Sequence, residues 1–196
     1  MIDLSEALER FQEWFDVADA HEQVLEANAM TLATAREDGR PAARTVLLKG
    51  FDERGFVFYT NTTSRKGQHL TVNPQAALLF HWAPLARQIL VEGDVATVSD
   101  QEADAYFASR PRLSQLGAWA SLQSQVLPSR EDFDARLAHY ESVYMDRDVE
   151  RPPHWTGYRL TPRMIEFWQG REGRLHDRER YFLDESGQWE WATIYP

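Results

Sequence analysis

The sequence predicts a mainly β protein: an antiparallel β-barrel with short flanking α-helices, formed by residues 1–196 as a single domain. Short apolar stretches recur at hairpin spacing, and turn signals such as Asp-Gly separate them. The helical patterns between these stretches are few and short, whereas a parallel α/β sheet needs a crossover helix between its strands. A chain of 196 residues with 43% hydrophobic residues is enough for one packed core.

The first part of the chain changes from a helical to a strand pattern. Apolar residues at helical spacing predict an amphipathic helix from Leu4 to Leu25, within an N-terminal helical segment of residues 1–27. Further along, a short helix capped by Ser64 is predicted to run to Asn73. Strands are predicted at 29–35, 44–49 and 55–60, with turns at 37–40 and 52–55.

Strands also dominate the second part of the chain. A helix capped by Ser99 or Asp100 is expected to end near Ser109, because Pro111 cannot continue it. Pro152 is followed by a second proline, so the backbone there is expected to be extended where the chain continues after the helix. The other predicted elements are a helix at 129–144, strands at 76–82, 88–98, 158–160, 164–168, 180–183 and 189–194, and a turn at 185–187.

Composition excludes several classes of function. The formal net charge of -10 argues against nonspecific binding to nucleic acid, whose phosphates would be repelled. The chain contains no cysteine, which excludes disulfides and thiolate chemistry. It contains neither a long apolar run nor a signal-peptide pattern, so we predict no membrane association and a cytoplasmic location.

The familiar catalytic and metal-binding motifs do not occur. The histidines lack metal-ligand spacing such as H-E-x-x-H, so no metal site is predicted. No G-x-S-x-G elbow, Walker loop or dinucleotide fingerprint is found either.

The densest cationic segment runs from Arg174 to Arg178. If it is extended, Arg174, His176 and Arg178 share one face, where they repel one another unless an anion lies against them. A solvated surface strand is the alternative. The aromatic stretch at 166–170 favours a flat ring beside these cations.

A second candidate is the stretch from Tyr59 to Gly67, a strand end that leads into a helix start. Free backbone N–H groups there, together with Ser64, Arg65 and Lys66, are suited to a phosphate. A serine cap followed by ordinary surface cations is the alternative.

Two further pairs of residues are less specific. Arg44 and Lys49 lie on opposite faces of a flat strand, so they serve one ligand only if a bulge or a strand end redirects one of them; otherwise they are surface residues. Tyr106 and Arg110 are one helical turn apart, and a helix C-terminus with its dipole complemented by arginine explains them equally well.

Taken together, the chain resembles the pyridoxine/pyridoxamine 5'-phosphate oxidases. The motifs that carry the resemblance are RTVLLK at 44–49, FYTN at 58–61, SRK at 64–66, RQ at 87–88, SRP at 109–111, GAW at 117–119, QS at 123–124, PPHW at 152–155, IEFWQG at 165–170 and RLHDR at 174–178. The resemblance implies a Greek-key split β-barrel homodimer with FMN at the subunit interface. It also implies oxidation of pyridoxamine and pyridoxine 5'-phosphates to pyridoxal 5'-phosphate, with O2 as acceptor and H2O2 released.

The resemblance also implies the roles of individual residues. By matching motif positions, the FMN contacts are Arg44, Thr45, Val46, Leu47, Leu48, Lys49, Tyr59, Thr60, Arg65, Lys66, Gln88, Gln123, Ser124, Trp168 and Arg178. The substrate contacts are Lys49, Tyr106, Arg110, Ser114, Arg174 and His176, with residues 152–196 completing the substrate site. Arg174 and His176 are the expected catalytic residues, which orient the substrate and stabilise charge at the reacting carbon.

This chain departs from the family pattern at both ends. Family members carry an N-terminal segment with Arg and Tyr that closes over the substrate, and we expect this chain to lack it. The family ending Arg-Leu-x-Pro is replaced by residues 192–196, ATIYP. Two rival functions stay open: a flavin oxidase of another aromatic substrate, such as the phenazine-pathway type, and a non-catalytic carrier of FMN or pyridoxal phosphate. The phosphate-binding residues Tyr106, Arg110 and Ser114, together with Arg174 and His176, argue against the former.

Overall fold

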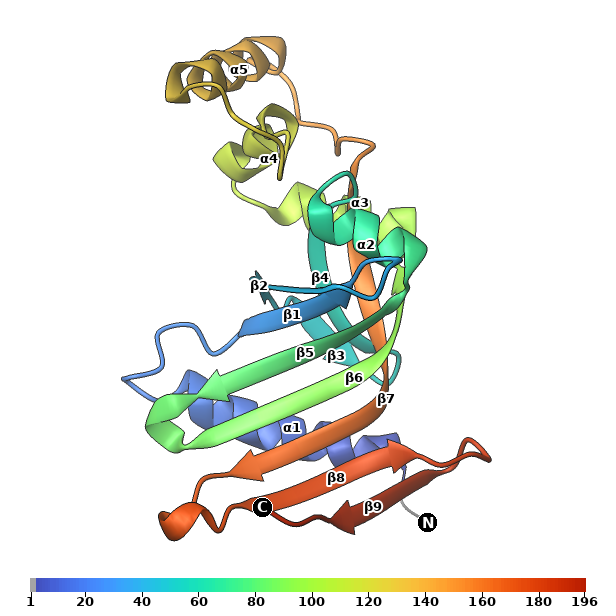
Figure 1. Ribbon diagram of the computed structural model, residues 1–196. Coiled ribbons are helices and arrows are strands. Elements are labelled where there is room, and N and C mark those ends of the chain that lie inside the picture. The colour runs from blue at the N-terminus through green and yellow to red at the C-terminus, as the bar shows by residue number, and fades with distance from the viewer. Residues whose placement is uncertain (1–2) are drawn as a thin grey trace.

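The computed structural model describes residues 3–196, so the first two residues of the predicted N-terminal segment lie outside the described part (Figure 1). The strands are β1 (Ala29–Ala35), β2 (Pro41–Leu47), β3 (Gly50–Asp52), β4 (Gly55–Asn61), β5 (Gln75–Trp82), β6 (Arg87–Thr97), β7 (Trp155–Gln169), β8 (Asp177–Leu183) and β9 (Trp189–Thr193). The α-helices are α1 (Leu4–Asp19), α2 (Arg65–Val72), α3 (Asp100–Ser109), α4 (Arg112–Ala120) and α5 (Arg130–Val143). Two 3-10 turns are η1 (Ala83–Leu85) and η2 (Glu172–Arg174).

The strands form one nine-stranded sheet with the main order β2-β1-β5-β6-β7-β4-β3, and β8 and β9 extend it from β7. The pairings within residues 3–196 are all antiparallel. Although β2 and β3 end the main path, only Leu48 and Lys49 separate them in the chain. The Leu48 N–H donates to Asn28 O and the Lys49 N–H to Val57 O, both at 2.8 Å. The sheet therefore curls back on itself, and the predicted mainly antiparallel β fold is confirmed.

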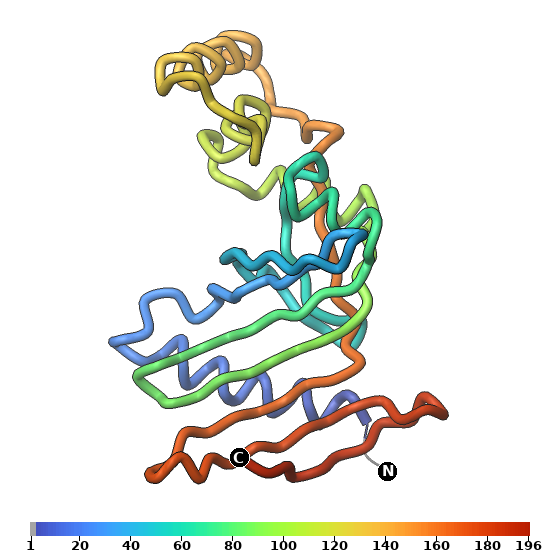
Figure 2. The backbone as a smooth tube through the Cα atoms, viewed as in Figure 1, coloured from blue at the N-terminus to red at the C-terminus, as the bar shows by residue number. Residues whose placement is uncertain are grey.

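Helix α1 covers one face of the curled sheet and supplies much of the core (Figures 1 and 2). The ring of Phe11 is fully buried, with its centroid 4.7 Å from that of Phe51, 4.9 Å from Phe56 and 5.2 Å from Phe80. Trp14 lies edge-on to Phe167 of β7 at 5.4 Å. Burial of each such ring contributes roughly 2–3 kcal/mol. The helix thus ties β3, β4, β5 and β7 together.

The opposite face of the sheet, which we call the open face, carries the alternate residues of the same strands. In β7, Ile165 and Phe167 are buried on the α1 side, so Glu166 and Trp168 lie on the open face. No helix covers this face over the central strands in Figure 1. Residues of neighbouring strands that stand in register share a face, which allows the two candidate clusters to be placed.

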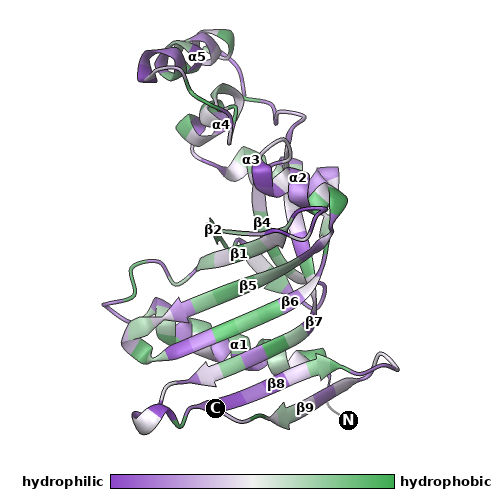
Figure 3. Cartoon of the chain, in the orientation of Figure 1, coloured by the Kyte–Doolittle hydropathy of each residue, from purple (hydrophilic) through white to green (hydrophobic). Residues whose placement is uncertain are grey.

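Helices α3, α4 and α5 pack at one end of the barrel around a second apolar cluster. Its buried members are Phe107, Leu116, Tyr144, Val149 and Trp155. Figure 3 shows α5 as largely hydrophilic and the middle of β5 and β6 as hydrophobic. This satellite cluster is smaller than the one beneath α1, and it positions α3 and α4 against the ends of β4 and β7.

Most predicted elements are confirmed, but several bounds are wrong. The first helix ends at Asp19 instead of Leu25, which is 94% exposed and has no core to join. The strands predicted at 158–160 and 164–168 are one strand, β7, because Pro162 sits where the β6 register shifts between Glu92 and Gly93.

The prediction missed β3 and α4. Strand β3 is only three residues long, too short for a period to be recognised. Helix α4 begins directly after Pro111, the residue that ends the preceding helical segment, so the two helices have no polar loop between them. A proline near a helix start is tolerated because the first N–H groups of a helix have no internal partner.

Candidate active site

A cavity of about 570 Å³ opens where the ends of β2 and β4 meet the start of α2 and the junction of α3 and α4. Most of the residues predicted to bind FMN or substrate from the first two thirds of the chain line it. They are Thr45, Val46, Leu47, Lys49, Tyr59, Thr60, Lys66, Tyr106, Arg110, Ser114 and Gln123, which we call the cavity cluster. Ser109, Pro111 and Trp155 also line the cavity, although they were not among the predicted site residues.

The start of α2 supplies an ammonium group and free backbone donors. Ser64 caps the helix by accepting the Gly67 N–H. The Lys66 ammonium donates to Thr60 Oγ1 at 3.1 Å and to Gln123 Oε1 at 2.8 Å. Burial lowers the pKa of Lys66, and the nearby charge of Arg44 lowers it further. A positive group bonded only to neutral oxygens is suited to an anion such as a phosphate.

Gly67 allows this helix start to lie against the preceding turn. A Cβ at that position would come within 2.2 Å of the Thr62 carbonyl oxygen, a backbone atom that cannot move independently. The glycine in the Ser64–Gly67 motif is therefore required by packing.

Arg44 lies beside the cavity cluster without lining the cavity. Its guanidinium donates to Leu32 O at 3.0 Å and to Thr34 Oγ1 at 2.7 Å, on the side of the sheet away from Lys49. Strand β2 ends at Leu47, so Lys49 follows the strand end and reaches the cavity. In the single chain the two side chains therefore do not line the same cavity.

Behind Arg44 lies a buried histidine, His69, whose Nδ1 is 3.0 Å from Thr34 Oγ1. Because that oxygen already accepts from Arg44, its own proton is available to His69. Burial lowers the pKa of His69, and the charges of Arg44, Arg65 and Arg36 lower it further. The imidazole of folded His69 is therefore neutral at neutral pH.

A pH dependence of stability follows from this lowered pKa. As the pH falls below about 6.5, the unfolded chain takes up a proton that folded His69 resists, so the free energy of unfolding decreases. The thermal unfolding temperature, measured from about pH 7 to about pH 5, should fall more steeply for the wild type than for His69→Gln, which keeps an acceptor for Thr34. His139→Gln, at an exposed position of α5, is the matched control for the substitution. Parallel curves for the wild type and His69→Gln would contradict the assignment.

Three aromatic rings form one wall of the cavity. The ring centroid of Tyr59 is 4.0 Å from that of Tyr106 and 5.2 Å from that of Trp155, with interplanar angles of 15° and 11°. Desolvation, aided by the charges of Glu102 and Tyr106, raises the pKa of Tyr59 to about 12. Tyr59 therefore stays protonated at neutral pH. A flat wall of this kind suits an aromatic ligand.

Arg110 stands at the junction of α3 and α4 and is held by stacking. Its Cζ atom is 4.7 Å from the Trp155 ring centroid and 5.6 Å from that of Phe107. Burial lowers its pKa, and its Nη1 is buried without a hydrogen-bond partner. Its backbone is extended at φ -73° and ψ 149°, just after the last residue of α3. A buried donor that lacks an acceptor is consistent with an anionic ligand.

The cations around the cavity share a further property. Within residues 3–196, no ion pair includes Arg44, Lys49, Arg65, Lys66 or Arg110. Elsewhere the chain pairs many of its arginines with carboxylates. Unpaired cations gathered at one cavity fit a dianionic group such as the phosphate of a nucleotide or of a vitamin B6 phosphate.

The other predicted residues form a second group, which we call the strand-end cluster: Gln88, Trp168, Arg174, His176 and Arg178. Gln88 stands opposite Trp168, and Trp168 opposite Arg178, so the three lie abreast across β6, β7 and β8. The His176 ring is 4.5 Å from that of Trp168. None of the five lines the cavity. Figure 1 shows β8 at the end of the molecule away from α3 and α4.

The predicted extended conformation from Arg174 to Arg178 is wrong. Arg174 ends η2 at φ 64°, after Gly173 at φ 65°, and β8 begins only at Asp177. The turn is closed by the Arg171 backbone N–H, which donates to His176 Nδ1 at 3.1 Å, and by an ion pair between Arg171 and Asp177. Arg174, His176 and Arg178 therefore do not share one face of a strand.

Of these cations, Arg178 is paired with a carboxylate of its own chain. Glu166, which is 3% exposed, binds the guanidinium groups of both Arg178 and Arg180. Sequence reasoning treated the stretch containing Glu166 only as aromatic and missed this carboxylate. The available signal was a single acidic residue in an otherwise apolar strand, which needs a partner when it is buried.

Both clusters face the same side of the sheet. Thr45 stands opposite Thr31, which lies between the buried residues Met30 and Leu32, so Thr45 is on the open face. Trp168 and Arg178 are on that face too. They occupy opposite ends of one curled face, so a single chain does not bring the two clusters together.

The remaining predicted residues lie close to the cavity. Leu48, in the link between β2 and β3, has a buried side chain. Arg65 is exposed at the start of α2. Ser124 follows Gln123 in the loop after α4 with φ 73°. None of these three lines the cavity in the single chain. Residues 3–196 contain no group of three or more acidic or histidine side chains that could hold a metal ion. No helix in the same range is long and apolar enough to cross a membrane.

The sequence profile of the family described as pyridoxamine 5'-phosphate oxidase matches residues 17–144. A second profile, the pyridoxine 5'-phosphate oxidase C-terminal dimerisation region, matches residues 155–196. Among curated relatives, the pyridoxine/pyridoxamine 5'-phosphate oxidase of Acaryochloris marina is 59% identical over 95% of this chain and 84% of the relative. That of Xanthomonas campestris pv. campestris is 54% identical over the full length of both.

Solved structures share the fold. PhzG from Burkholderia lata 383, in complex with tetrahydrophenazine-1-carboxylic acid, superposes with a TM-score of 0.87 at 34% identity, over 99% of this chain and 93% of that one. An FMN-binding protein of Nostoc punctiforme, related to pyridoxamine 5'-phosphate oxidase, gives a TM-score of 0.74 at 19% identity, over 95% of this chain and 97% of its own. With two family profiles covering most of its length and relatives above 50% identity, this chain belongs to the pyridoxine/pyridoxamine 5'-phosphate oxidase family.

Proposed function

We propose that this chain is an FMN-dependent oxidase that converts pyridoxamine and pyridoxine 5'-phosphates to pyridoxal 5'-phosphate, with O2 as acceptor and release of H2O2. The amine substrate also consumes water and releases ammonia, because its imine is hydrolysed. The observation that carries the proposal is the cavity with unpaired cations at two places, Lys66 at the start of α2 and Arg110 at the junction of α3 and α4. Two phosphate positions are what a complex of FMN with a phosphorylated substrate requires. The curated relatives are named for this activity.

The residues around α2 fit the phosphate of FMN. Arg44, Arg65 and Lys66 would hold it. Burial lowers the pKa of Lys66 and the nearby charge of Arg44 lowers it further, and Arg65 likewise lowers the pKa of Arg44 after burial, so the three cations lie near one another. When bound, FMN would supply the two-electron oxidation and pass the electrons to O2. Gln123, held by Thr60 and Lys66, would contact the cofactor from the loop after α4.

The other end of the cavity fits the substrate. Arg110, stacked on Trp155, keeps its donors free for the substrate phosphate, with Tyr106 and Ser114 beside it. Lys49 would complete the set from the end of β2. Because the phosphate is bound at a distance from the reacting carbon, the binding energy serves to orient that carbon.

Arg174 and His176 would act at the reacting carbon. His176 accepts the Arg171 N–H at Nδ1, so in its neutral form the ring carries its proton on Nε2 and can donate there. Arg174 makes no ion pair within the described chain and is exposed on η2. Both groups are thus available to a ligand outside their own chain.

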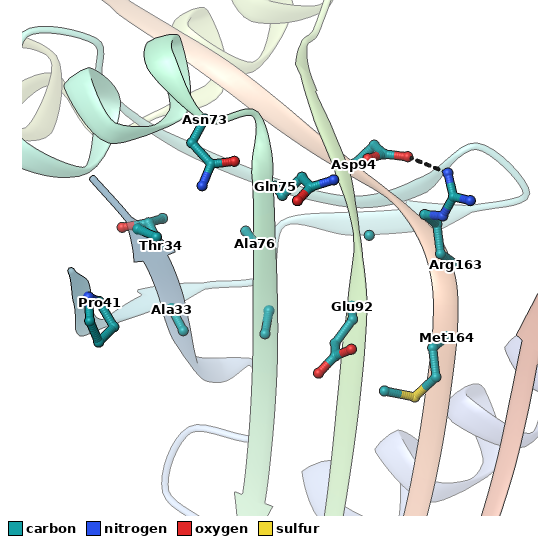
Figure 4. Close-up of a pocket in the computed structure, with 13 residues that line it drawn as sticks. Ala33, Thr34, Pro41, Asn73, Gln75, Ala76, Glu92, Asp94, Arg163 and Met164 are labelled. Atoms are coloured by element: carbon teal, nitrogen blue, oxygen red, sulfur yellow. Dashed lines mark hydrogen bonds and ion pairs between the residues drawn. The ribbon is translucent and has the colours of Figure 1, made fainter. Parts of the chain in front are cut away.

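A homodimer would bring the two clusters together. The open face carries both, so a two-fold axis that lies in the plane of this face, perpendicular to the line joining the two clusters, places the strand-end cluster of one chain against the cavity cluster of its partner, twice. A hollow of about 490 Å³ lies on the same face, lined by the row Ala33, Ala77, Glu92 and Met164 across β1, β5, β6 and β7 (Figure 4). The small side chains of Ala33 and Ala77 in this row allow the partner's surface to approach. The C-terminal dimerisation profile includes β7 and β8 of this face.

An oxidase of a phenazine precursor is the second candidate, favoured by the 34% identity and TM-score of 0.87 with PhzG. The unpaired Arg110 beside Tyr106 and Ser114 supports a phosphorylated substrate instead. A cytoplasmic location remains part of the proposal, and the absence of cysteine favours it.

The purified protein should be yellow, with one FMN per chain, and should release H2O2 when pyridoxamine 5'-phosphate is added. The unphosphorylated amine is the matched control, since it lacks the group that Arg110 binds and should react far more slowly. Protein that stays colourless after incubation with FMN would rule out the proposal. Protein that binds FMN but releases no peroxide with either phosphate would leave the carrier function, and peroxide release with a phenazine precursor alone would favour the second candidate.

A further inference from the structure

Glu166 is a buried carboxylate that none of the proposed contacts with cofactor or substrate uses. It lies on the open face of β7, two residues before Trp168, and only 3% of its surface is exposed. An isolated carboxylate at this depth would be strongly unfavourable, so its partners decide what it does. Those partners are two arginines of β8, Arg178 and Arg180.

Each oxygen of Glu166 serves one arginine. Oε1 accepts from Nε of Arg178 at 2.9 Å and from its Nη2 at 2.8 Å. Oε2 accepts from Nε of Arg180 at 3.3 Å and from its Nη2 at 2.9 Å. The register explains the geometry, because Glu166 stands directly opposite Arg180 and diagonal to Arg178.

Arg178 is also held from the C-terminal end of the chain. Its Nη1 donates to the Tyr195 carbonyl oxygen at 3.1 Å, and its own carbonyl accepts the Ile194 N–H at 3.0 Å. These contacts involve only backbone atoms of residues 194 and 195. The unusual ending at 192–196 therefore preserves them whatever its side chains are.

We propose that Glu166 is a positioning residue for the cofactor, acting through Arg178. This inference rests on the proposed function, in which Arg178 contacts FMN bound to the partner chain. Glu166 and the Tyr195 carbonyl orient the guanidinium before the ligand arrives, so little side-chain entropy is lost on binding. Glu166 also supplies the negative charge that lets Arg178 and Arg180 lie side by side.

The expected result concerns FMN affinity, measured by titrating the apoprotein dimer with FMN and following the quenching of flavin fluorescence. Glu166→Gln keeps the size of the side chain but loses its charge and turns an amide N–H toward one arginine. It should weaken FMN binding about tenfold or more, because Arg178 is released. Arg178→Ala should weaken it at least as much. The double variant should bind FMN within about twofold of Arg178→Ala alone, because both changes remove the same contact.

Two control variants separate positioning from general loss of structure. Glu179→Gln removes a different carboxylate, which lies in β8 and is paired with Arg10 on the α1 side. This variant should leave FMN affinity within about twofold of wild type. Arg180→Gln removes the other partner of Glu166 but leaves the Arg178 contact, and should change FMN affinity less than about threefold. This variant keeps the proposal testable if Glu166→Gln does not fold.

The outcomes distinguish this inference from the proposed function. If Arg178→Ala binds FMN as tightly as wild type, Arg178 is not a flavin contact and the proposed site is wrong. If Arg178→Ala is weak while Glu166→Gln binds normally, the site stands and the positioning role of Glu166 is refuted. Equal losses in Arg180→Gln and Arg178→Ala would also refute it, since Glu166 would then act on the sheet as a whole.

Discussion

Two inactive variants of this chain should restore activity to each other when they share a dimer. Arg110→Ala removes the proposed phosphate contact in the cavity cluster, and Arg174→Ala removes a contact in the strand-end cluster. Because each site of the proposed dimer takes one cluster from each chain, a mixed dimer holds one site with both defects and one intact site. A mixed dimer purified through two different affinity tags should show about half of wild-type activity per dimer.

The control for this experiment pairs two variants of the same cluster. In a mixed dimer of Arg110→Ala and Lys66→Ala, each site has one defect, so activity should stay near that of the separate variants. Absence of recovery with Arg110→Ala and Arg174→Ala would mean that each site is built within one chain. Recovery in the control would mean that Arg110 and Lys66 of one chain serve different sites, which would contradict the cavity cluster. The unmixed dimers of each variant, measured alongside, set the background.

Arg174→Ala should lose most of its activity while keeping FMN. A charge-assisted contact to a desolvated substrate is worth roughly 2–4 kcal/mol, which corresponds to a loss of about 30- to 1000-fold in kcat/KM for pyridoxamine 5'-phosphate. FMN content should be unchanged, because Arg174 lies on η2, outside the row of Gln88, Trp168 and Arg178. Arg178→Ala should show the reverse pattern, with FMN lost first.

Arg171→Ala provides the matched control for Arg174→Ala. Arg171 is an exposed arginine of the same turn, but its charge is already paired with Asp177. Its loss should change kcat/KM only a few-fold, since an exposed ion pair is worth about 0–1 kcal/mol. If Arg174→Ala lost flavin but kept normal substrate affinity once reconstituted, its assignment to the substrate would be wrong.

Local patterns in the sequence predicted most of the elements. The Ser64 and Ser99 caps and the strands at 29–35 and 76–82 agree with the structure because caps and period-two alternation depend on a few adjacent residues. Two misses have local causes as well. Helix α4 follows α3 with no polar loop between them, and Pro162 interrupts the pattern of β7 but is accommodated by a shift in register.

Part of the candidate site could also be predicted: RTVLLK, SRK and RLHDR occur in family order, and the cavity is lined by four residues of the first motif, by Lys66 of the second and by Tyr106 of α3. The arrangement of the third motif was not. A strand pattern predicts one face for Arg174, His176 and Arg178, but Gly173 at φ 65° and the contacts of Arg171 fold the segment into a turn.

What the sequence alone determined is most of the strands and helices, without β3 and α4, and the kinds of residue at the candidate site: cations, flat aromatic rings and a helix start suited to phosphate. The tertiary structure decided that these groups form two clusters at opposite ends of one open face, and that Glu166 supports Arg178. The physical reason is that strand register and curl depend on pairings between residues far apart in the chain, such as Gln88 with Trp168, which no local period encodes.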